Sequence, residues 1–174
     1  MKPHHHLGSA IVFSMVVIAG PAAASAAPPS QTARAACVET DRAAVAAAFD
    51  AWQRGTAPIT DVFAPEMTWR IEGQTLVSQE FGSRQEFIDK VLAPFGARMS
   101  TTEPFRPVRV QAVICDGNDV VVLWDGRGTA NDGKPYENTY AWFLKMKDGK
   151  VVDGTAMFDS IAFNDLWNRV QPRE

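Results

Sequence analysis

The residue in this sequence that is best suited to acid/base chemistry is Asp159, which ends an alternating stretch that begins at Tyr136. Its neighbours Met157 and Phe158 are apolar, and burial of a carboxyl group among apolar side chains raises its pKa. Such a group can exchange a proton near neutral pH. The same position also suits the N-cap of a following helix, because a residue between a strand and a helix often accepts a hydrogen bond from the helix backbone. The sequence leaves both roles of Asp159 open.

Side chains that could surround a ligand lie on the same stretch and on two other predicted strands. Alternation along the stretch puts six residues on one mostly apolar face, which suits the wall of a small-molecule pocket: Tyr136, Asn138, Tyr140, Trp142, Leu144 and Met146. Tyr140 could donate a hydrogen bond to a developing oxyanion, so we pair it with Asp159 as a candidate catalytic residue. Asn138 could fix a carbonyl or hydroxyl group of a ligand. The other predicted ligand-binding residues are Trp69, Trp124, Trp142 and Met157. The alternative for any single tryptophan is a place in the hydrophobic core. The pattern predicts an apolar pocket and does not identify its ligand.

Residues 1–26 have the pattern of a secretory signal peptide. Lys2 precedes an apolar run from Leu7 to Gly20, and Ala24-Ser25-Ala26 is a suitable cleavage site, with Ala22-Ala23-Ala24 as a second choice. The run is shorter than the roughly 20 residues that a membrane-spanning helix needs. We therefore expect a periplasmic or secreted protein without membrane contact after cleavage, with a flexible lead-in over 27–39 and one domain over 40–170.

Removal of this peptide would leave a chain without histidine, because the only three are His4, His5 and His6. Such a chain excludes a Ser-His-Asp or Cys-His nucleophile and any histidine-ligated metal site. Acid/base work would fall to carboxylates, tyrosines or lysines. We expect no metal and no organic cofactor.

The charged residues and the cysteines limit the partners and the compartment. The formal net charge is −3 and no basic cluster is present, so nucleic acid is not an expected partner. Cys37 and Cys115 are the only cysteines, and after export an even number suggests a disulfide bond. That bond would contribute roughly 4 to 5 kcal/mol in the chain-entropy model. The alternative is two unpaired, buried thiols.

Hydrophobic periodicity and turn residues predict helices first and strands afterwards. We expect three helices. The first covers 40–54 with Thr40 as its cap, and the second begins after Pro58. The third covers 84–95, where Ser83 and Glu86 form a capping box. The predicted strands are 67–71, 108–114, 120–129, 136–146 and 151–159, followed by a short amphipathic tail. A turn at Lys147-Asp148-Gly149-Lys150 is expected to join the last two strands as a hairpin. This order predicts an α+β fold with helices packed on one side of a curved sheet.

Four short motifs carry a resemblance to a known family. They are Phe63-Ala64-Pro65-Glu66-Met67-Thr68-Trp69, Gly82-Ser83-Arg84, Asp132-Gly133-Lys134-Pro135-Tyr136 with Asn138 and Tyr140, and Asp148-Gly149-Lys150-Val151-Val152 followed by Asp159. Over roughly residues 40–168 the chain resembles the SnoaL-like branch of the nuclear transport factor 2-like superfamily. The resemblance implies a cone-shaped α+β fold with about three N-terminal helices on a strongly curved, mostly antiparallel sheet. Polyketide cyclases of this family have a general acid/base aspartate at the spacing of Asp159.

The resemblance has further implications. Asp125 and Arg127 share one strand face, which is similar to related epoxide hydrolases, although a surface salt bridge is the alternative. Gly126 and Gly128 predict a bend or bulge in the sheet. Dimerisation across the outer sheet face is implied by the family and not by the residues themselves.

Two classes of function follow. In the first, the protein is a small exported enzyme without cofactor that performs carboxylate acid/base chemistry, of the isomerase, cyclase or hydratase type, on a small apolar molecule. In the second, it is a non-catalytic module that binds such a molecule or a protein partner. The missing histidine and the single well-placed carboxylate favour the second class more strongly than the resemblance does.

Overall fold

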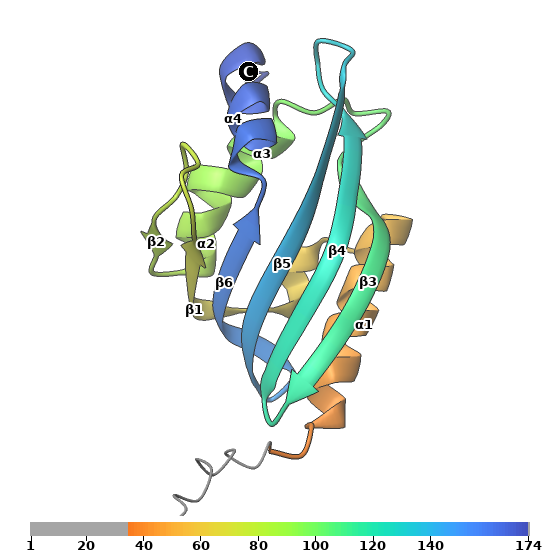
Figure 1. Ribbon diagram of the computed structural model, residues 1–174, viewed down its shortest axis with the longest axis vertical. Helices are drawn as coiled ribbons and strands as arrows, with labels where there is room; N and C mark the ends of the chain where they lie inside the picture. Colours follow the sequence, from red (N-terminus) through yellow and green to blue (C-terminus); the bar gives the residue numbers. More distant parts are fainter. Residues whose placement is uncertain (1–34, 174) are drawn as a thin grey trace, which may run out of the picture. The chain divides into compact units, whose positions relative to one another are not determined.

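A single curved sheet organises the part of the chain that the structure describes, residues 35–173 of 174 (Figure 1). The predicted signal peptide and most of the predicted lead-in lie outside these residues. The elements in chain order are α1 Glu39–Arg54, the 3₁₀ helix η1 Ile59–Val62, β1 Phe63–Ile71, β2 Glu80–Phe81, α2 Arg84–Phe87, the π-helix η2 Ile88–Leu92, α3 Ala93–Gly96, β3 Arg106–Asp116, β4 Asp119–Thr129, β5 Pro135–Lys147, β6 Lys150–Phe158 and α4 Ser160–Arg169.

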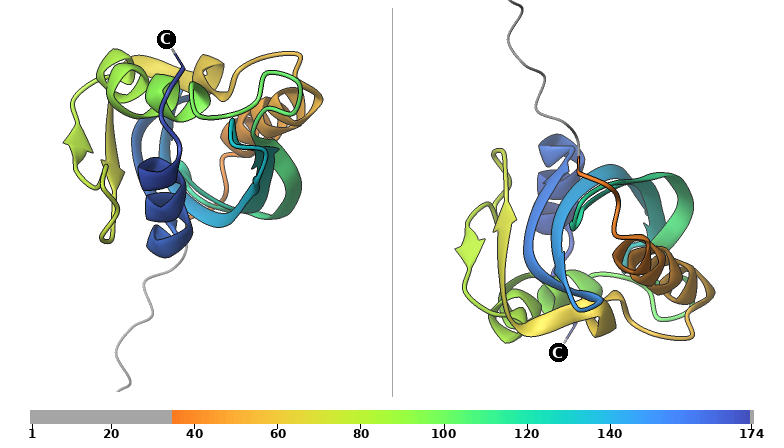
Figure 2. Two further views of the ribbon diagram at one scale, coloured as in Figure 1. Left: turned by 90° about the horizontal axis from the view of Figure 1, so that it is seen from above. Right: turned by 90° about the horizontal axis from the view of Figure 1, so that it is seen from below.

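The six strands lie in the order β2-β1-β6-β5-β4-β3, and every neighbouring pair is antiparallel except β1 and β6. The long strands curl into an arc (Figure 2). Helix α1 packs against β3 and β4, and α2 packs against β1, so the helices close the concave side of this arc. The predicted α+β fold with a strongly curved, mostly antiparallel sheet is confirmed.

The turn between β5 and β6 is set by local sequence. Asp148 and Gly149 have φ angles of 52° and 73°, and Lys147 pairs with Lys150 across the turn. Two consecutive left-handed residues match the twist of an antiparallel hairpin, and glycine adopts this conformation without steric cost. The predicted hairpin at this turn is confirmed.

The helices differ from prediction at two points. Helix α1 begins at Glu39 after Val38, with no side-chain cap, so the predicted cap at Thr40 is wrong. The buried Asp41 instead accepts a hydrogen bond from the Gly149 N–H at 3.1 Å, which ties the first turn of α1 to the β5–β6 turn.

No helix within residues 35–173 has the length and apolar character needed to cross a bilayer.

The helix predicted over 84–95 is present in three pieces, α2, η2 and α3. Ser83 caps α2 as predicted, because its Oγ accepts from the Glu86 N–H at 3.1 Å. Pro94 has no N–H to donate to the preceding turn, and a missing donor of this kind disturbs the regular α-helical bonding. The break into a π-helical turn just before Pro94 is consistent with that loss.

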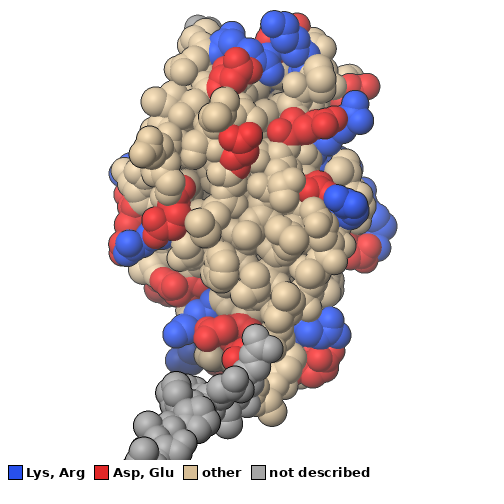
Figure 3. Space-filling view, viewed as in Figure 1, with Lys and Arg blue, Asp and Glu red and all other residues tan. Residues whose placement is uncertain are grey.

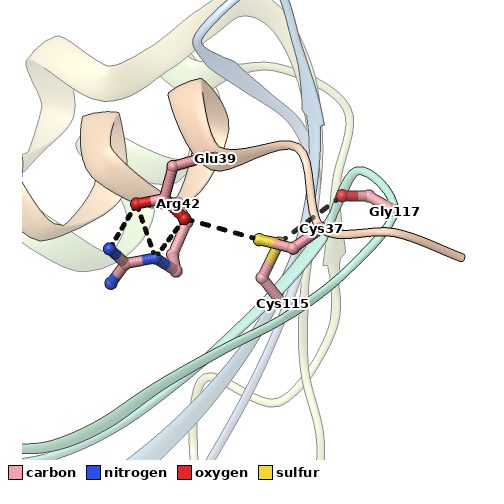
Figure 4. The surroundings of a disulfide bond; sticks show 5 residues. All are labelled: Cys37, Glu39, Arg42, Cys115 and Gly117. Atoms are coloured by element: carbon pink, nitrogen blue, oxygen red, sulfur yellow. Dashed lines mark hydrogen bonds and ion pairs between the residues drawn. A yellow bond between two sulfur atoms is a disulfide. The ribbon is translucent and has the colours of Figure 1, made fainter. Parts of the chain in front are cut away.

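Cys37 and Cys115 form a disulfide bond with a Cα–Cα distance of 5.2 Å, which joins the start of α1 to the end of β3 (Figure 4). Beside it, the Val38 N–H donates to the Gly117 carbonyl at 2.8 Å. The bridge confirms one of the two alternatives left open for these cysteines. Because disulfides persist mainly in oxidising environments, it indicates an oxidising compartment.

Candidate functional site

A cavity of about 300 Å³ lies among aromatic side chains on the concave side of the sheet. Four of the five tryptophans of the chain line it: Trp52, Trp69, Trp124 and Trp142. Phe105 and Tyr140 are also part of its wall. None of the Asp, Glu, Lys or Arg residues between 35 and 173 lines it. Within the same range, no cluster of His, Cys, Asp or Glu could hold a metal ion. The walls are therefore suited to an apolar ligand.

Strand alternation and register bring these aromatic residues together. The predicted inward face of β5 is buried along its whole length and consists of Tyr136, Asn138, Tyr140, Trp142, Leu144 and Met146. Of these residues, Tyr140 and Trp142 reach the cavity wall. Trp124 on β4 is the register partner of Tyr140, and their rings stack with centroids 4.2 Å apart. Trp69 on β1 meets Trp142 edge to face at 5.1 Å.

Two glycines make room for the aromatic rings. Gly154 on β6 is the register partner of Trp69, and a Cβ on it would lie well under 3.0 Å from Cε3 and Cζ3 of the Trp69 ring. A Cβ on Gly126 would collide with the Phe105 ring. The bulge predicted near Gly126 lies on the neighbouring strand, where the register of β3 shifts between Pro107 and Arg109, while β4 pairs with β5 without interruption.

A chain of hydrogen bonds runs behind the cavity wall from Asn138 to Tyr140. Asn138 Nδ2 donates to the Tyr136 hydroxyl at 3.0 Å, and that hydroxyl is 3.0 Å from the Tyr140 hydroxyl. Burial raises the pKa of both phenols, that of Tyr140 well above its ordinary value. Both tyrosines therefore stay protonated, which suits donation of a hydrogen bond and not removal of a proton.

Asp159 is exposed and does not line the cavity. Its Oδ1 accepts from the Ile161 N–H at 2.8 Å, which caps α4. Its backbone N–H and C=O both bond to the Asn138 amide at 3.0 Å. Met157 points away from the cavity and is 50% exposed, because alternation along β6 turns Ala156 inward. This geometry favours the capping role of Asp159 over contact with a ligand in the cavity.

Replacement of Asp159 by alanine is expected to lower the free energy of unfolding by about 1 kcal/mol, because α4 loses its cap. Asp159→Asn keeps a side-chain acceptor and should cost much less. Urea denaturation of the two variants and the unaltered protein measures the difference. Equal stability of all three would show that the cap adds nothing and would favour a chemical role for this residue.

The predicted pairing of Asp125 with Arg127 is wrong, because strand register gives each a partner on a neighbouring strand. Asp125 accepts from Thr139 at 2.8 Å and from Arg109 at 2.7 Å, and these hydrogen bonds hold its pKa below the usual range. Arg127 pairs with Glu137 at 3.1 Å. Both pairs lie on the sheet face opposite the cavity, so Asp125 and Arg127 each form a surface ion pair with another residue and not with each other.

Sequence reasoning missed three residues of the site. Trp52 lies on the apolar face of α1 and lines the cavity, but it was not among the predicted ligand-binding residues. Phe105 precedes β3 outside any periodic pattern, and only Gly126 and Gly128, which leave it space, point to it. Tyr136 was recognised as inward-facing but not as the partner of Tyr140.

Comparison with known proteins adds to this geometry. A family model, the SnoaL-like domain, matches residues 45–154, more than half of the chain. The chain belongs to the SnoaL-like domain family. No curated protein sequence matches this SnoaL-like protein.

Solved structures of NTF2-like proteins share the fold of this SnoaL-like chain. One from Burkholderia thailandensis E264 is 20% identical, with a TM-score of 0.59, over 72% of this chain and 95% of that one. TerC, co-crystallized with polyporic acid, is 19% identical with a TM-score of 0.59, over 74% and 98% of the two chains. IdmH, a candidate polyketide cyclase from Streptomyces antibioticus, is 16% identical with a TM-score of 0.55, over 74% and 98%. At these identities the comparison establishes the fold alone.

Proposed function

We propose that this SnoaL-like protein binds a small apolar molecule in the 300 Å³ cavity, with Trp69, Trp124 and Trp142 as walls and Tyr140 as the polar contact. The observation that carries the proposal is the cavity itself, because concave sites with aromatic walls and few polar groups are typical of small-molecule binding. The polyporic acid of TerC supports a small-molecule ligand for this fold.

The geometry favours binding over acid/base catalysis. The proposed catalytic pair, Asp159 and Tyr140, does not share the cavity wall, since only Tyr140 lines it. A general base must lie within hydrogen-bond reach of the proton that it removes. IdmH supports the enzyme as the second candidate, because a cyclase-type activity is attributed to the same fold. We place the non-catalytic ligand-binding module first.

Filling the cavity is expected to abolish binding while the fold persists. Ala156 is buried on the wall, so the extra carbon atoms of Ala156→Leu must enter the cavity. We expect tetralin, an apolar bicyclic probe, to bind the unaltered protein and to bind Ala156→Leu at least about tenfold more weakly, which corresponds to roughly 1.4 kcal/mol. Isothermal titration calorimetry measures both affinities, and circular dichroism checks the fold. Failure of tetralin to bind the unaltered protein, or equal binding to both, would contradict the proposal.

We further propose export, with removal of residues 1–26, a lead-in over 27–39 and a single domain over 40–170. The disulfide bond supports this, because cytosolic thiols are kept reduced. The intact mass of the protein isolated from the periplasm or the medium tests the cleavage site.

The outer face of the sheet carries two apolar rows that support the proposed homodimer. Register places Ile114, Val121 and Phe143 in one row, and Ala112, Leu123, Ala141 and Met157 in the next. Figure 3 shows the centre of this face free of charged side chains. At its edge Asp125 is paired with Arg109, which leaves no unpaired charge there for a charged partner. A second copy of the chain offers matching apolar rows, as two-fold symmetry requires.

Phe143→Asp is expected to convert the dimer into monomers, since Phe143 is 46% exposed on β5, between Val121 of β4 and Thr155 of β6. A carboxylate buried without a partner in each subunit is strongly unfavourable. Light scattering after size-exclusion chromatography measures the mass. Ile161→Asp is the matched control, because Ile161 is 83% exposed on α4 and belongs to neither apolar row. A monomeric unaltered protein, or a dimeric Phe143→Asp variant, would rule out this interface.

A further inference from the structure

The amide of Asn138 has every hydrogen-bonding atom engaged. Its two Nδ2 hydrogens go to the Tyr136 hydroxyl and to the Asp159 carbonyl, and its Oδ1 accepts the Asp159 N–H, each at 3.0 Å. A rotated amide would set its NH₂ group against the Asp159 N–H, so this network assigns the orientation. Asn138 is therefore a donor to Tyr136.

This donation determines the direction of the next hydrogen bond. Tyr136 already accepts from Asn138, and among residues 35–173 its own hydroxyl hydrogen has only the Tyr140 hydroxyl within reach. If Tyr140 donated instead, the Tyr136 hydrogen would be left without an acceptor, although Tyr136 is buried and does not line the cavity. Buried donors without an acceptor are rare because they are costly. The favoured arrangement has Tyr136 donating to Tyr140.

With that arrangement, the hydrogen that remains free is that of Tyr140, which lines the cavity. Two other donors on the wall, the indole N–H groups of Trp69 and Trp124, have no acceptor within residues 35–173, but their nitrogen atoms are inaccessible. Each indole belongs to edge-to-face aromatic pairs, in which an N–H group can rest against a ring. Tyr140 is thus better placed for a ligand than these two indoles. The wall also carries the Thr60 hydroxyl and the indoles of Trp52 and Trp142. Among all these donors, Tyr140 is the one whose hydrogen is directed by a buried chain of hydrogen bonds.

We infer that Tyr140 donates its hydroxyl hydrogen to a carbonyl oxygen of an otherwise apolar ligand, and that Asn138 and Tyr136 are positioning residues that set this direction. The inference rests on the proposed function, because it concerns the ligand of the same cavity. A ligand without an acceptor would leave the Tyr140 hydrogen unpaired, and a charged ligand would find no counter-charge among the described residues of the wall. The structure therefore indicates an apolar ketone or quinone as the class of ligand.

Tetralin and 1-tetralone test this inference, because they share a bicyclic frame and differ by the carbonyl group. We expect the affinity ratio, 1-tetralone over tetralin, to fall about tenfold in Tyr140→Phe, which removes the hydrogen bond to the ketone. The infrared carbonyl stretch of bound 1-tetralone should lie at lower frequency in the unaltered protein than in that variant. Tetralin affinity itself reports whether the cavity is intact in each variant.

Tyr136→Phe tests the direction. If Tyr136 donates to Tyr140, this variant keeps or slightly lowers the ratio and keeps the infrared shift, since the Tyr140 hydrogen was already free. A ratio that rises in Tyr136→Phe would show that Tyr140 donates to Tyr136 and would overturn the inference. An unchanged ratio in Tyr140→Phe would overturn it as well. Thr60 carries the other hydroxyl of the described wall, and loss of the infrared shift in Thr60→Val would show that Thr60 and not Tyr140 is the donor. If neither probe binds the unaltered protein, the proposed function itself fails.

Discussion

Gly154→Ala is expected to lower the free energy of unfolding by about 3 kcal/mol, at the upper end of the usual cost of overpacking a core. The new Cβ would fall well under 3.0 Å from the Trp69 ring. That ring is 1% exposed and stacks on Phe87 with centroids 4.9 Å apart, so it has little freedom to move away. Strand β6 cannot retreat either, because β1 and β5 flank it. Urea denaturation measures the loss.

Gly96→Ala is the matched control. A Cβ at Gly96 meets nothing within 4 Å and its φ angle is not positive, so the substitution should change stability by less than about 1 kcal/mol. In Gly154→Ala the displaced Trp69 ring should also disturb the cavity wall, and tetralin affinity should fall with stability. Equal stability of the two variants would show that Trp69 is loosely held and would weaken the case for a preformed cavity.

The parts of the fold that the sequence predicted correctly depend on local signals. The alternation from Tyr136 to Met146 predicted the inward face of β5, since successive residues of a strand point to opposite sides. The Ser83 cap and the Asp148-Gly149 turn also depend on residues close together in the chain. Each signal is present within a few residues, and tertiary packing did not override it.

The site was less predictable because its residues meet through strand register. Asp125 is opposite Arg109 and Thr139 only because three strands align as they do, and no spacing along the chain shows this. Met157 was predicted to line the pocket because the sequence did not show which residues of β6 face inward. A shift of one residue exchanges the two faces of a strand. The cap and pocket roles of Asp159 have the same local sequence, so the position of α4 decides between them.

Replacement of both Cys37 and Cys115 by serine is expected to lower the free energy of unfolding by about 4 kcal/mol, near the upper limit of the chain-entropy model for a long loop. The bridge joins residues separated by 78 positions, and it crosses from the start of α1 to the end of β3. Its main effect is to restrict the unfolded chain, so the variant should unfold from a near-native structure into a more expanded ensemble. Urea denaturation should show a lower midpoint and a steeper dependence on denaturant.

The comparison with reduced protein separates this entropic effect from local packing. If the bridge acts mainly on the unfolded chain, the unaltered protein with dithiothreitol should match the double variant in stability, and tetralin should bind both with unchanged affinity below the transition. If the bridge instead holds α1 in place, tetralin affinity should fall in the folded variant, because Trp52 of α1 lines the cavity. In the second outcome, the redox state of these cysteines would change ligand binding as well as stability. In the first, it would change stability alone.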